Sequence, residues 1–437
     1  MYREQRITRR SFLKGAAAIA APYIIRPSAL GLEGTVSPSN RTTLGFIGTG
    51  DHGVGRNLKG FLTHPDSHIL AVCDVDSTLR ENAKKIVEAH YAEAMSKGEY
   101  KGCAAYNDFR EIIARKDIDA VVNSTPDHWH VIPSIMAARA GKDVICEKPL
   151  SLTVVEGRVL SDTVKKHNRI FQTSSENRSV DVYHRMCELV RNGRIGKLKR
   201  ILVTLPRGRW IRTASMEFGP PPKGFDYDMW LGQAPEAPYC QARCHWNFRW
   251  VLDYSGGMLT DWGAHLIDIA QWGNNTEHTG PVEVEGKGLF PKKGIYNTAT
   301  EFDVNYKYAN GVELNVSSSD PGIHFEGTDG WIENKGWTAP LEASAKSVLE
   351  SKIGPEETHL YTCPGGEHRN FLDCVKSRKQ CYGPAEIGHR TITIAHIGNI
   401  AMILGRKLKW DPEKERFVNN PEADKMLSRP MRPPWTL

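Results

Sequence analysis

The first half of the chain alternates short apolar runs with longer stretches of helical periodicity. Each apolar run ends in glycine or in polar residues, which is typical of strands followed by turns. The predicted strands are 43–47, 68–73, 120–123 and 143–146, and the predicted helices are 54–62, 79–90 and 109–114. Because strands that alternate with helices pair in parallel, this half predicts a doubly wound α/β domain.

The second half continues with a different order of helices and strands. The helices are predicted at 153–166, 182–191, 367–376 and 386–404, and the strands at 169–173, 200–205, 302–308 and 312–317. Asn310 and Gly311 separate the last two strands and are a strong signal for a hairpin turn. The stretch 218–223, rich in proline and glycine, and the tail after residue 411 are predicted to be loops or oligomer contacts.

The composition is that of a globular protein with two domains. The chain has 437 residues, of which 40% are hydrophobic and 25% are charged. These values exclude a mainly disordered or collagen-like protein. The net charge of +6 is concentrated in residues 1–30, which hold six basic residues and one acidic residue. The nearly neutral remainder argues against nucleic-acid binding, which needs clustered cations.

The amino terminus resembles a twin-arginine export signal. Arg9 and Arg10 stand directly before Ser-Phe-Leu-Lys, and a modestly apolar run over 16–25 follows. This run is too short to span a bilayer, which takes about 20 residues, and no later segment is long and apolar enough. We therefore expect residues 1–31 to be a signal peptide and the protein to be periplasmic, without a transmembrane segment. The twin-arginine route exports folded proteins, so it favours a tightly held cofactor.

The nine cysteines match neither a disulfide scaffold nor a strong zinc spacing. Cys240, Cys244 and His245 form the one local cluster, but it lacks a fourth ligand nearby. Buried thiols or one disulfide are expected, and no metal is predicted. The role of the cluster stays open.

A glycine-rich turn over 48–53 joins the first predicted strand to the first predicted helix. Gly48 permits the sharp bend, Gly50 lets the backbone approach a pyrophosphate, and Gly53 lets helix and strand pack closely. Asp74 ends the second predicted strand, where a carboxylate accepts the ribose hydroxyls of NAD and repels the phosphate of NADP. NAD is therefore the predicted cofactor. The predicted contacts in this part of the chain are Gly48, Thr49, Gly50, Asp51, His52 and Asp74.

Glu147 and Lys148 follow the strand at 143–146, at the sheet edge where open α/β sheets bind ligands. Pro149 fixes the next backbone torsion, which favours a functional pair over an ordinary surface ion pair. Further along, Asp261 and His265 stand four residues apart, so on a helix they share one face. A capped helix with a core histidine is the alternative interpretation of these two residues.

Four segments together resemble the glucose–fructose oxidoreductase / inositol dehydrogenase (Gfo/Idh/MocA) family. They are the turn 48–53, Ser-Thr-Pro-Asp-His-Trp-His over 124–130, Glu-Lys-Pro-Leu over 147–150, and Gly-Gly-Met-Leu-Thr-Asp-Trp-Gly-Ala-His over 256–265. The resemblance covers about residues 42–410. It implies a Rossmann domain over 42–149, a C-terminal α/β domain with an open, mostly antiparallel sheet over 150–410, and a tail over 411–437. It also implies a homodimer or homotetramer.

By resemblance, Lys148, Asp261 and His265 form the proton-transfer set beside the nicotinamide, and the Lys148-Pro149 peptide is cis. Oxidation of a carbinol carbon needs a base for the hydroxyl proton, and His265, with a pKa near neutrality, is the best candidate. Lys148 would stabilise the developing alkoxide, and Asp261 would orient its partners or accept the proton.

The remaining site predictions lie at strand ends and in a tryptophan-rich segment. His128 and His130 suggest a metal, but Trp129 and the family pattern favour stacking against the cofactor. Tryptophan faces stack on sugar rings, although most tryptophans belong to a core or an interface. The further cofactor contacts are Thr125, His128, Trp129, His130, Glu147, Lys148 and Asn177, and the substrate contacts are Arg178, Trp246 and Trp262.

These observations predict an exported oxidoreductase that moves hydride from a sugar, polyol or glycoside to tightly bound NAD. A second interpretation is a redox-neutral glycosidase or lyase. The chain resembles the NAD-dependent α-N-acetylgalactosaminidases in its twin-arginine start and its Trp-x-His segment, but it lacks their Tyr-Pro-Thr-His run at 261–265. A third interpretation is a binding protein that keeps NAD as a structural ligand.

Overall fold

The computed structural model describes residues 36–437 of the chain. Residues 36–41 include the short 3-10 helix η2 (Pro38–Asn40) and belong to a unit separate from residues 42–437, which form all the elements below. The predicted signal peptide over 1–31 lies outside the described residues.

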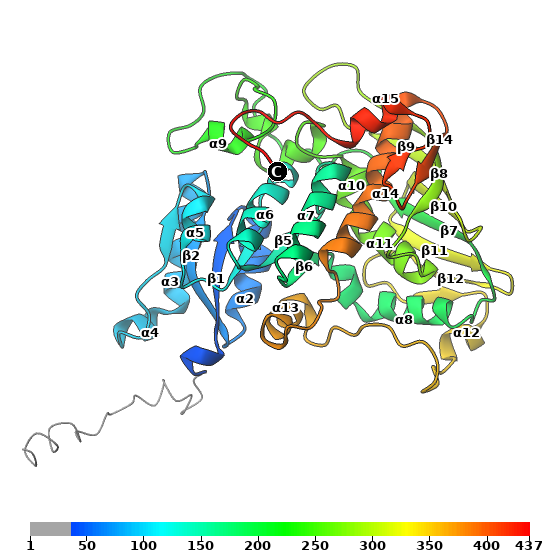
Figure 1. The fold of residues 1–437 in the computed structure, drawn as a ribbon, viewed down its shortest axis with the longest axis horizontal. Coiled ribbons are helices and arrows are strands. Elements are labelled where there is room, and N and C mark those ends of the chain that lie inside the picture. Colours follow the sequence, from blue (N-terminus) through cyan, green and yellow to red (C-terminus); the bar gives the residue numbers. More distant parts are fainter. Residues whose placement is uncertain (1–35) are drawn as a thin grey trace, which may run out of the picture. The chain divides into compact units, whose positions relative to one another are not determined.

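The first half of the larger unit forms a six-stranded sheet in the order β3-β2-β1-β4-β5-β6 (Figure 1). All neighbouring strands in it pair in parallel. Strands β4 and β5 are buried at every position, as expected for a sheet with helices on both faces. The doubly wound parallel sheet is confirmed. The strands are β1 (Thr42–Ile47), β2 (Ser67–Cys73), β3 (Ala104–Tyr106), β4 (Ala120–Asn123), β5 (Asp143–Glu147) and β6 (Phe171–Ser174).

Local caps fix where the helices of this half begin. Asp76 accepts hydrogen bonds from the backbone of Thr78 and Leu79 at the start of α3, and Thr153 forms a capping box with Glu156 at the start of α7. The cap at Asp76 holds α3 next to the end of β2. The helices are the π-helical η3 (Gly53–Leu58), α2 (Lys59–Leu62), α3 (Ser77–His90), α4 (Ala92–Ser96), α5 (Phe109–Ala114), η4 (Asp127–Trp129), α6 (Val131–Arg139) and α7 (Val154–Lys166).

Two features of this sheet differ from the sequence analysis. Strand β3 was not predicted, because three partly buried residues at a sheet edge carry no alternating pattern. Strand β6 completes the sheet although it follows residue 149, where the Rossmann domain was expected to end. The parallel sheet therefore continues to Ser174.

The second half forms a nine-stranded sheet in the order β13-β12-β11-β7-β10-β9-β8-β14-β15. Strands β7 and β10 pair in parallel, and the other pairings are antiparallel. Strand β9 alternates exposed and buried residues along its length, the pattern of a sheet with one open face. The mostly antiparallel sheet is confirmed. The strands are β7 (Leu198–Leu205), β8 (Pro281–Leu289), β9 (Glu301–Tyr308), β10 (Glu313–Ser318), β11 (Gly322–Gly327), β12 (Trp331–Asn334), β13 (Leu341–Ala343), β14 (Leu408–Asp411) and β15 (Arg416–Phe417).

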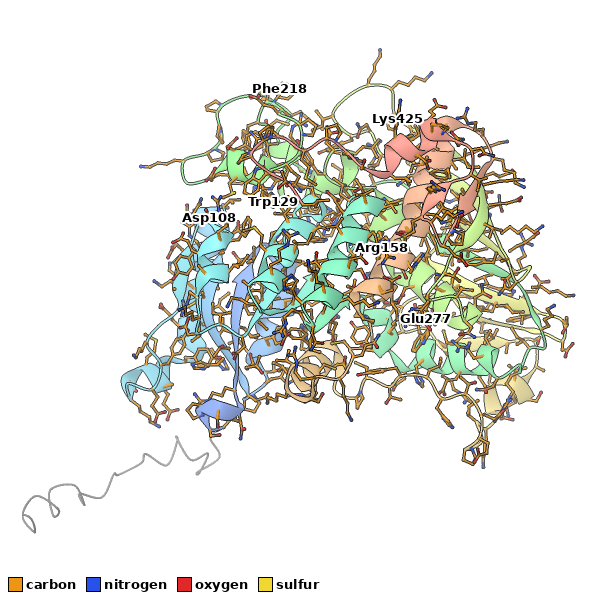
Figure 2. The ribbon with its side chains drawn as sticks, in the orientation of Figure 1. Asp108, Trp129, Arg158, Phe218, Glu277 and Lys425 are labelled. Atoms are coloured by element: carbon orange, nitrogen blue, oxygen red, sulfur yellow. The ribbon has the colours of Figure 1, made fainter. Side chains whose placement is uncertain are left out.

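Helices α7 and α14 lie side by side between the two sheets (Figure 1). Arg158 of α7, labelled in Figure 2, joins them: its guanidinium lies 2.7 Å from Glu386 of α14 and 2.8 Å from Glu415. This contact ties the parallel sheet to the helices that cover the second sheet. The helices after β6 are η5 (Glu176–Ser179), α8 (Asp181–Arg191), α9 (Tyr227–Leu231), η6 (Gln241–Arg243), η7 (His245–Trp250), α10 (Met258–Asp261), α11 (Gly263–Asn274), α12 (Lys346–Glu350), α13 (Gly366–Ser377) and α14 (Ala385–Leu404). Of these, α8, α11, α12 and α14 pack on strands of the second sheet, whereas α13 packs in the core of the parallel sheet.

The tail after residue 411 is more ordered than the loops predicted there. It contains β15, α15 (Pro421–Asp424) and η8 (Lys425–Leu427). Near its end, Trp435 packs edge-on against Trp129, with 4.7 Å between the ring centroids. The tail thus returns to the parallel-sheet half, where a large, partly buried apolar side chain packs against the core. No helix within residues 36–437 has both the length and the hydropathy needed to cross a bilayer.

Candidate active site

The glycine turn after β1 has the shape that a dinucleotide requires. Gly48 has a φ of +86°, and a Cβ atom there would lie 2.6 Å from the backbone of Ser124. A Cβ atom on Gly53 would overlap the carbonyl oxygen of Gly48, so a side chain at either position would force the turn apart. A Cβ atom on Gly50, in contrast, would meet nothing within 4 Å. The open backbone at Gly50, just before a helix, fits the pyrophosphate of NAD.

Asp74 follows β2 and is held in place by backbone donors. Its Oδ2 atom accepts a hydrogen bond from the amide of Thr49 at 2.7 Å, and its Oδ1 atom accepts one from the amide of Asp76 at 2.9 Å. Burial raises the pKa of Asp74, and these donors oppose the rise. Thr49 is only 2% exposed, so its contribution is to hold Asp74. A fixed carboxyl group at this edge fits the ribose hydroxyls of NAD.

A cavity of about 410 Å³ follows the carboxyl ends of the parallel strands. The glycine turn, Asp74 and Lys148 line it on the side of the parallel sheet, and residues 212–214 and 244–249 line it from the second half. Figure 2 shows Trp129 at the same end of the sheet as the loop that carries Phe218. The predicted site residues that line this cavity are Gly48, Gly50, Asp51, His52, Asp74, Thr125, Trp129, Glu147, Lys148 and Trp246. Asp261, His265 and Trp262 are not part of the lining, and Asp261 is joined to it through Lys148.

Glu147 ends β5 as a buried carboxylate. Its Oε1 atom accepts a hydrogen bond from Asn57 at 2.8 Å and lies 3.1 Å from Nε2 of His52. Burial alone would raise the pKa of Glu147, but His52 and Lys148 hold it well below its usual range. In return, Glu147 raises the pKa of His52. Glu147 thus connects the helix after the glycine turn with the end of β5.

Lys148 forms a short ion pair with Asp261 across the two halves. The peptide between Lys148 and Pro149 is cis, as the resemblance implies. The Lys148 Nζ atom lies 2.7 Å from Oδ1 of Asp261 and 3.3 Å from its carbonyl oxygen. Burial alone would lower the pKa of Lys148, but the Asp261 carboxylate holds it above the ordinary value. Lys148 is therefore a charged ammonium group that lines the cavity.

His265 lies on α11, one turn after Asp261, and is 4% exposed. Burial, followed by the positive charge of Lys148, lowers its pKa to about 3. This value lies far below the near-neutral pKa expected from the sequence, because the imidazole is shielded from water and stands near a cation. His265 is consequently a neutral imidazole at physiological pH. Its ring packs edge-on against Trp337, with 4.9 Å between the centroids.

The histidines on either side of Trp129 lie behind the cavity. His128 contacts the carbonyl oxygen of Trp230 at 2.9 Å, and His130 contacts the carbonyl oxygens of Pro149 at 2.6 Å and of Thr125 at 2.8 Å. Burial lowers the pKa of both. Only Trp129 of the three lines the cavity. The predicted stacking of His128 and His130 on the cofactor therefore has no support in the structure. His130 instead connects the backbone at Thr125 with the backbone at Pro149.

Arg178 is not placed for the substrate contact predicted for it. Its Nε and Nη2 atoms donate to Asp268 at 2.6 and 2.8 Å, and its Nη1 atom donates to Glu277 at 2.6 Å. The side chain is 3% exposed and does not line the cavity. Three of its five donors bind carboxylates inside the protein, and its partner Glu277 is far away in sequence. Asn177 is fully buried, and its carboxamide lacks a hydrogen-bond partner among residues 36–437.

A row of tryptophans leads from the cavity to His265. Trp246 lines the cavity, and its Nε1 atom donates to the carbonyl oxygen of Trp210 at 2.6 Å. Trp210 packs edge-on against Trp262 at 5.4 Å, and Trp262 packs against Trp337 at 5.7 Å. Trp337 in turn contacts His265. Trp246 and Trp262, both predicted substrate contacts, therefore belong to one aromatic wall formed by Trp210, Trp246, Trp262 and Trp337.

Both halves of the chain match models of known oxidoreductase domains. Residues 42–175 match the NAD-binding Rossmann fold of the oxidoreductase family Gfo/Idh/MocA, and residues 189–437, more than half of the chain, match its C-terminal alpha/beta domain. The chain belongs to the Gfo/Idh/MocA family. As a member of this NAD-binding oxidoreductase family, it has NAD as its cofactor.

The individual proteins to which the chain is similar match it over a short stretch or at low identity. A glycosyl hydrolase family 109 protein of Shewanella pealeana is 31% identical over 155 residues, 35% of this chain and 32% of that protein. Levoglucosan dehydrogenase of Pseudarthrobacter phenanthrenivorans is 29% identical over 166 residues, 38% of this chain and 35% of that protein. The chain thus spans about a third of these curated relatives. The structure of aldose-aldose oxidoreductase from Caulobacter crescentus covers 84% of this chain and 99% of its own, with a TM-score of 0.60 and 16% identity.

Two acidic residues of this Gfo/Idh/MocA member were missed in the sequence analysis. Asp127 lines the cavity and accepts a hydrogen bond from Ser255 at 2.5 Å, and burial raises its pKa to about 7. Glu176 lies 3.8 Å from His265. Asp127 lies inside the Ser-Thr-Pro-Asp-His-Trp-His segment over 124–130, so the sequence offers a signal for it. Glu176 and Trp337 carry no signal, because their place near His265 depends on contacts between distant segments.

The cysteines of the predicted cluster are free thiols in the structure. Cys240 and Cys244 are buried free thiols, and all nine cysteines are free. Within the described part of the chain, no group of three histidine, cysteine, aspartate or glutamate side chains is placed to hold a metal ion.

Proposed function

We propose that the protein is an exported oxidoreductase that transfers hydride from a sugar, polyol or glycoside to tightly held NAD. One observation carries this proposal: the Lys148 ammonium group lines the cofactor cavity and is held 2.7 Å from Asp261, one helical turn before His265. A charged donor and a neutral imidazole at this sheet edge are what oxidation of a carbinol requires.

Each residue has a defined part in this chemistry. NAD, when bound, supplies the acceptor for the hydride. Lys148 has three donors, of which two point to the carboxylate and carbonyl oxygens of Asp261, so one remains for the oxygen of the substrate. Asp261 holds that ammonium group in place. His265, a neutral imidazole, accepts the hydroxyl proton.

The aromatic wall supports a carbohydrate as the substrate. Tryptophan faces pack against the apolar C–H side of a sugar ring, while the ring hydroxyls need polar partners. Arg249 supplies such a partner, because it lies over the ring of Trp246 at 4.4 Å and 3.5 Å from Asp261. Levoglucosan dehydrogenase and the glycosyl hydrolase family 109 protein, to which the chain is similar, carry names that fit this substrate class.

The loop that contains Arg212 supports retention of NAD. Arg212 forms an ion pair with Asp51 of the glycine turn, and the carboxamide of Asn247 binds its backbone amide and carbonyl at 2.9 and 2.8 Å. The ion pair is exposed and by itself contributes little. The backbone hydrogen bonds to Asn247 hold the loop next to the glycine turn. A loop fixed there would slow the release of a bound dinucleotide.

A redox-neutral glycosidase is the second candidate, and Asp127 is the observation that favours it. Cleavage of a glycoside needs an acid to protonate the leaving oxygen, and a cavity carboxyl group with a pKa of about 7 is protonated in part at neutral pH. In this reaction the hydride returns to the same sugar, so no cofactor is consumed. A protein that binds NAD without turnover is the third candidate.

Purified protein tests the proposal directly. After extensive dialysis the protein is expected to retain NAD(H) and to convert glycosides with no cofactor added, and the Lys148→Met variant is expected to retain NAD(H) without converting them. An oxidised sugar paired with a reduced acceptor indicates the oxidoreductase, and a released aglycone indicates the glycosidase. Activity strictly proportional to added NAD would contradict retention, and bound NAD without conversion of any sugar would favour the binding protein.

Export and assembly are proposed separately. We expect a fusion of residues 1–31 to a reporter to reach the periplasm only when Arg9 and Arg10 are present. We also expect the purified protein to be a homodimer or homotetramer in light scattering. A monomer, or export that persists with both arginines replaced by lysine, would contradict these two expectations.

A further inference from the structure

Glu176 and His265 face each other although they come from different elements. Glu176 begins η5 directly after β6, and His265 lies on α11. The Oε2 atom of Glu176 is 3.8 Å from Nδ1 of His265. Both atoms are buried, and neither has a hydrogen-bond partner within residues 36–437. Buried polar atoms are almost always paired, so two unpartnered atoms that face each other call for an explanation.

The backbone around Glu176 is fixed against α11. The hydroxyl of Ser175 donates to the carbonyl oxygen of Ala264, the residue before His265, at 3.2 Å. The other carboxylate oxygen of Glu176 lies 3.7 Å from Arg56. The Glu176 side chain is therefore held between a cation and the imidazole. A small rotation would close the remaining gap, and hydrogen bonds between catalytic groups are often this long before the substrate binds.

We propose that Glu176 is a positioning residue that accepts the Nδ1–H of His265 and thereby leaves Nε2 as the basic nitrogen for the substrate. The inference rests on the proposed function. A carboxylate only accepts hydrogen bonds, so a neutral imidazole that faces it places its single proton on Nδ1. When the hydroxyl proton of the substrate moves to Nε2, the Nδ1 proton stays where it is, and the carboxylate stabilises the imidazolium that forms.

This role resolves a difficulty in the proposed chemistry. His265 is surrounded by charges of both signs, and burial together with Lys148 makes it a weak base. A carboxylate that accepts the Nδ1–H raises the basicity of Nε2 when the proton is transferred to it. The charged groups that act on His265 are Lys148, Asp261, Glu147, Arg56 and Glu176.

The tautomer of His265 is the decisive measurement, and it does not depend on turnover. Protein labelled with ¹⁵N-histidine reports which ring nitrogen carries the proton, and the His265 signals are identified by their loss in His265→Gln. We expect the Nδ1–H tautomer in the wild type. In Glu176→Gln the carboxamide donates to Nδ1, so we expect the proton to appear on Nε2.

Glu367→Gln is the matched control, because Glu367 pairs with the same Arg56 at 2.7 Å and is also buried, at 3% exposed against 9% for Glu176, but makes no contact with His265 in the described structure. It should leave the His265 tautomer unchanged. Glu176→Asp, which keeps the carboxylate, should also keep it. An Nε2–H tautomer in the wild type, or an unchanged tautomer in Glu176→Gln, would overturn the proposal.

Kinetics supply the second readout once a substrate is known. Glu176→Gln should lower kcat by roughly 10²–10⁴-fold with little change in KM, because the substrate contacts remain, and Glu176→Asp should recover part of the loss. A rise in KM with kcat unchanged would contradict the positioning role. If the wild type converts no sugar, the proposed function fails, while the tautomer measurement still decides the pairing of Glu176 and His265.

Discussion

Two buried ion pairs join the parallel-sheet half to the helices α10 and α11, and only one of them reaches the cavity. Lys148 pairs with Asp261, and both side chains keep about a tenth of their surface exposed, 12% and 11%. Arg178 pairs with Asp268, and each is 3% exposed. Arg178 also donates to Glu277, and its guanidinium lies over the ring of Trp272.

The difference lies in what each cation can reach. Two of the three Lys148 donors are used by Asp261, and Lys148 lines the cavity. The guanidinium of Arg178 donates three hydrogen bonds to two carboxylates, lies over an aromatic ring and is not part of the cavity lining. A buried cation with an unused donor at a cavity is able to bind a substrate oxygen, whereas one enclosed by carboxylates away from the cavity holds the fold. Both residues follow strands of the same sheet, so their position alone does not separate these roles.

The largest effect is expected at Lys148. Lys148→Met removes the donor for the substrate oxygen, so turnover should fall by roughly 10³-fold or more, while NAD stays bound through the glycine turn and Asp74. Arg249, 3.5 Å from Asp261, still compensates that carboxylate, so the fold should persist. Turnover and bound NAD, both measured on the dialysed variant, check this. Wild-type rates would remove Lys148 from the chemistry.

The opposite outcome is expected at Arg178. Arg178→Met leaves Asp268 buried without its cation, while Glu277 keeps Arg191 at 3.8 Å, so the free energy of unfolding should fall by about 3–5 kcal/mol through Asp268. Denaturant unfolding measures this loss. Folded molecules should turn over at close to the wild-type rate, because Arg178 does not line the cavity. A stable variant with lost activity would reverse the comparison and restore the predicted substrate contact.

Asp127 gives a smaller effect that depends on pH. Its carboxyl group has a pKa of about 7 in the folded protein, raised by burial from an ordinary value near 4. Between these two values the folded state binds more protons than the unfolded state, so this group's contribution to stability falls as the pH rises, by at most about 1.4 kcal/mol per pH unit. Asp127→Asn should therefore reduce the difference between the free energies of unfolding measured at about pH 5 and at about pH 7, two values within roughly this window. If the free energy of unfolding depends on pH equally in the variant and the wild type, Asp127 is not a buried protonated carboxyl group.

The smallest effect on stability is expected at Arg212. Its side chain is 53% exposed and that of Asp51 is 70% exposed, so loss of their ion pair should change the free energy of unfolding by less than about 1 kcal/mol. Arg212→Ala should nevertheless release bound NAD faster during dialysis, because the loop loses its contact with the glycine turn. Arg207→Ala, an exposed change nearby in sequence, is the control. Equal release from both variants and the wild type would exclude the loop from retention.

The parts of the site that the sequence predicts are those encoded locally. The glycine turn, Asp74 and Lys148 each follow a strand within a few residues, so a short pattern identifies both the element and the role. The cis peptide came from the family resemblance. The parallel pairing of the strands also follows from their alternation with helices, except for β3, which is too short to give a pattern.

The parts that the sequence does not predict depend on contacts between distant segments. The sequence predicts Arg178 as a substrate contact from its place after a strand end. Its partner Glu277 lies about a hundred residues away, and no local pattern links them. Glu176 was overlooked for the same reason. The low pKa of His265 was also missed, because burial and the neighbouring ammonium group exist only once both halves pack together.

Transfer of a labelled hydride tests the central claim most directly. Dialysed protein is mixed with glycosides that carry deuterium on their ring carbons, and the retained cofactor is released and weighed by mass spectrometry. The account predicts that deuterium appears in the cofactor of the wild type and of folded Arg178→Met, but not in that of Lys148→Met. Conversion of the sugar with no deuterium in the cofactor would contradict it.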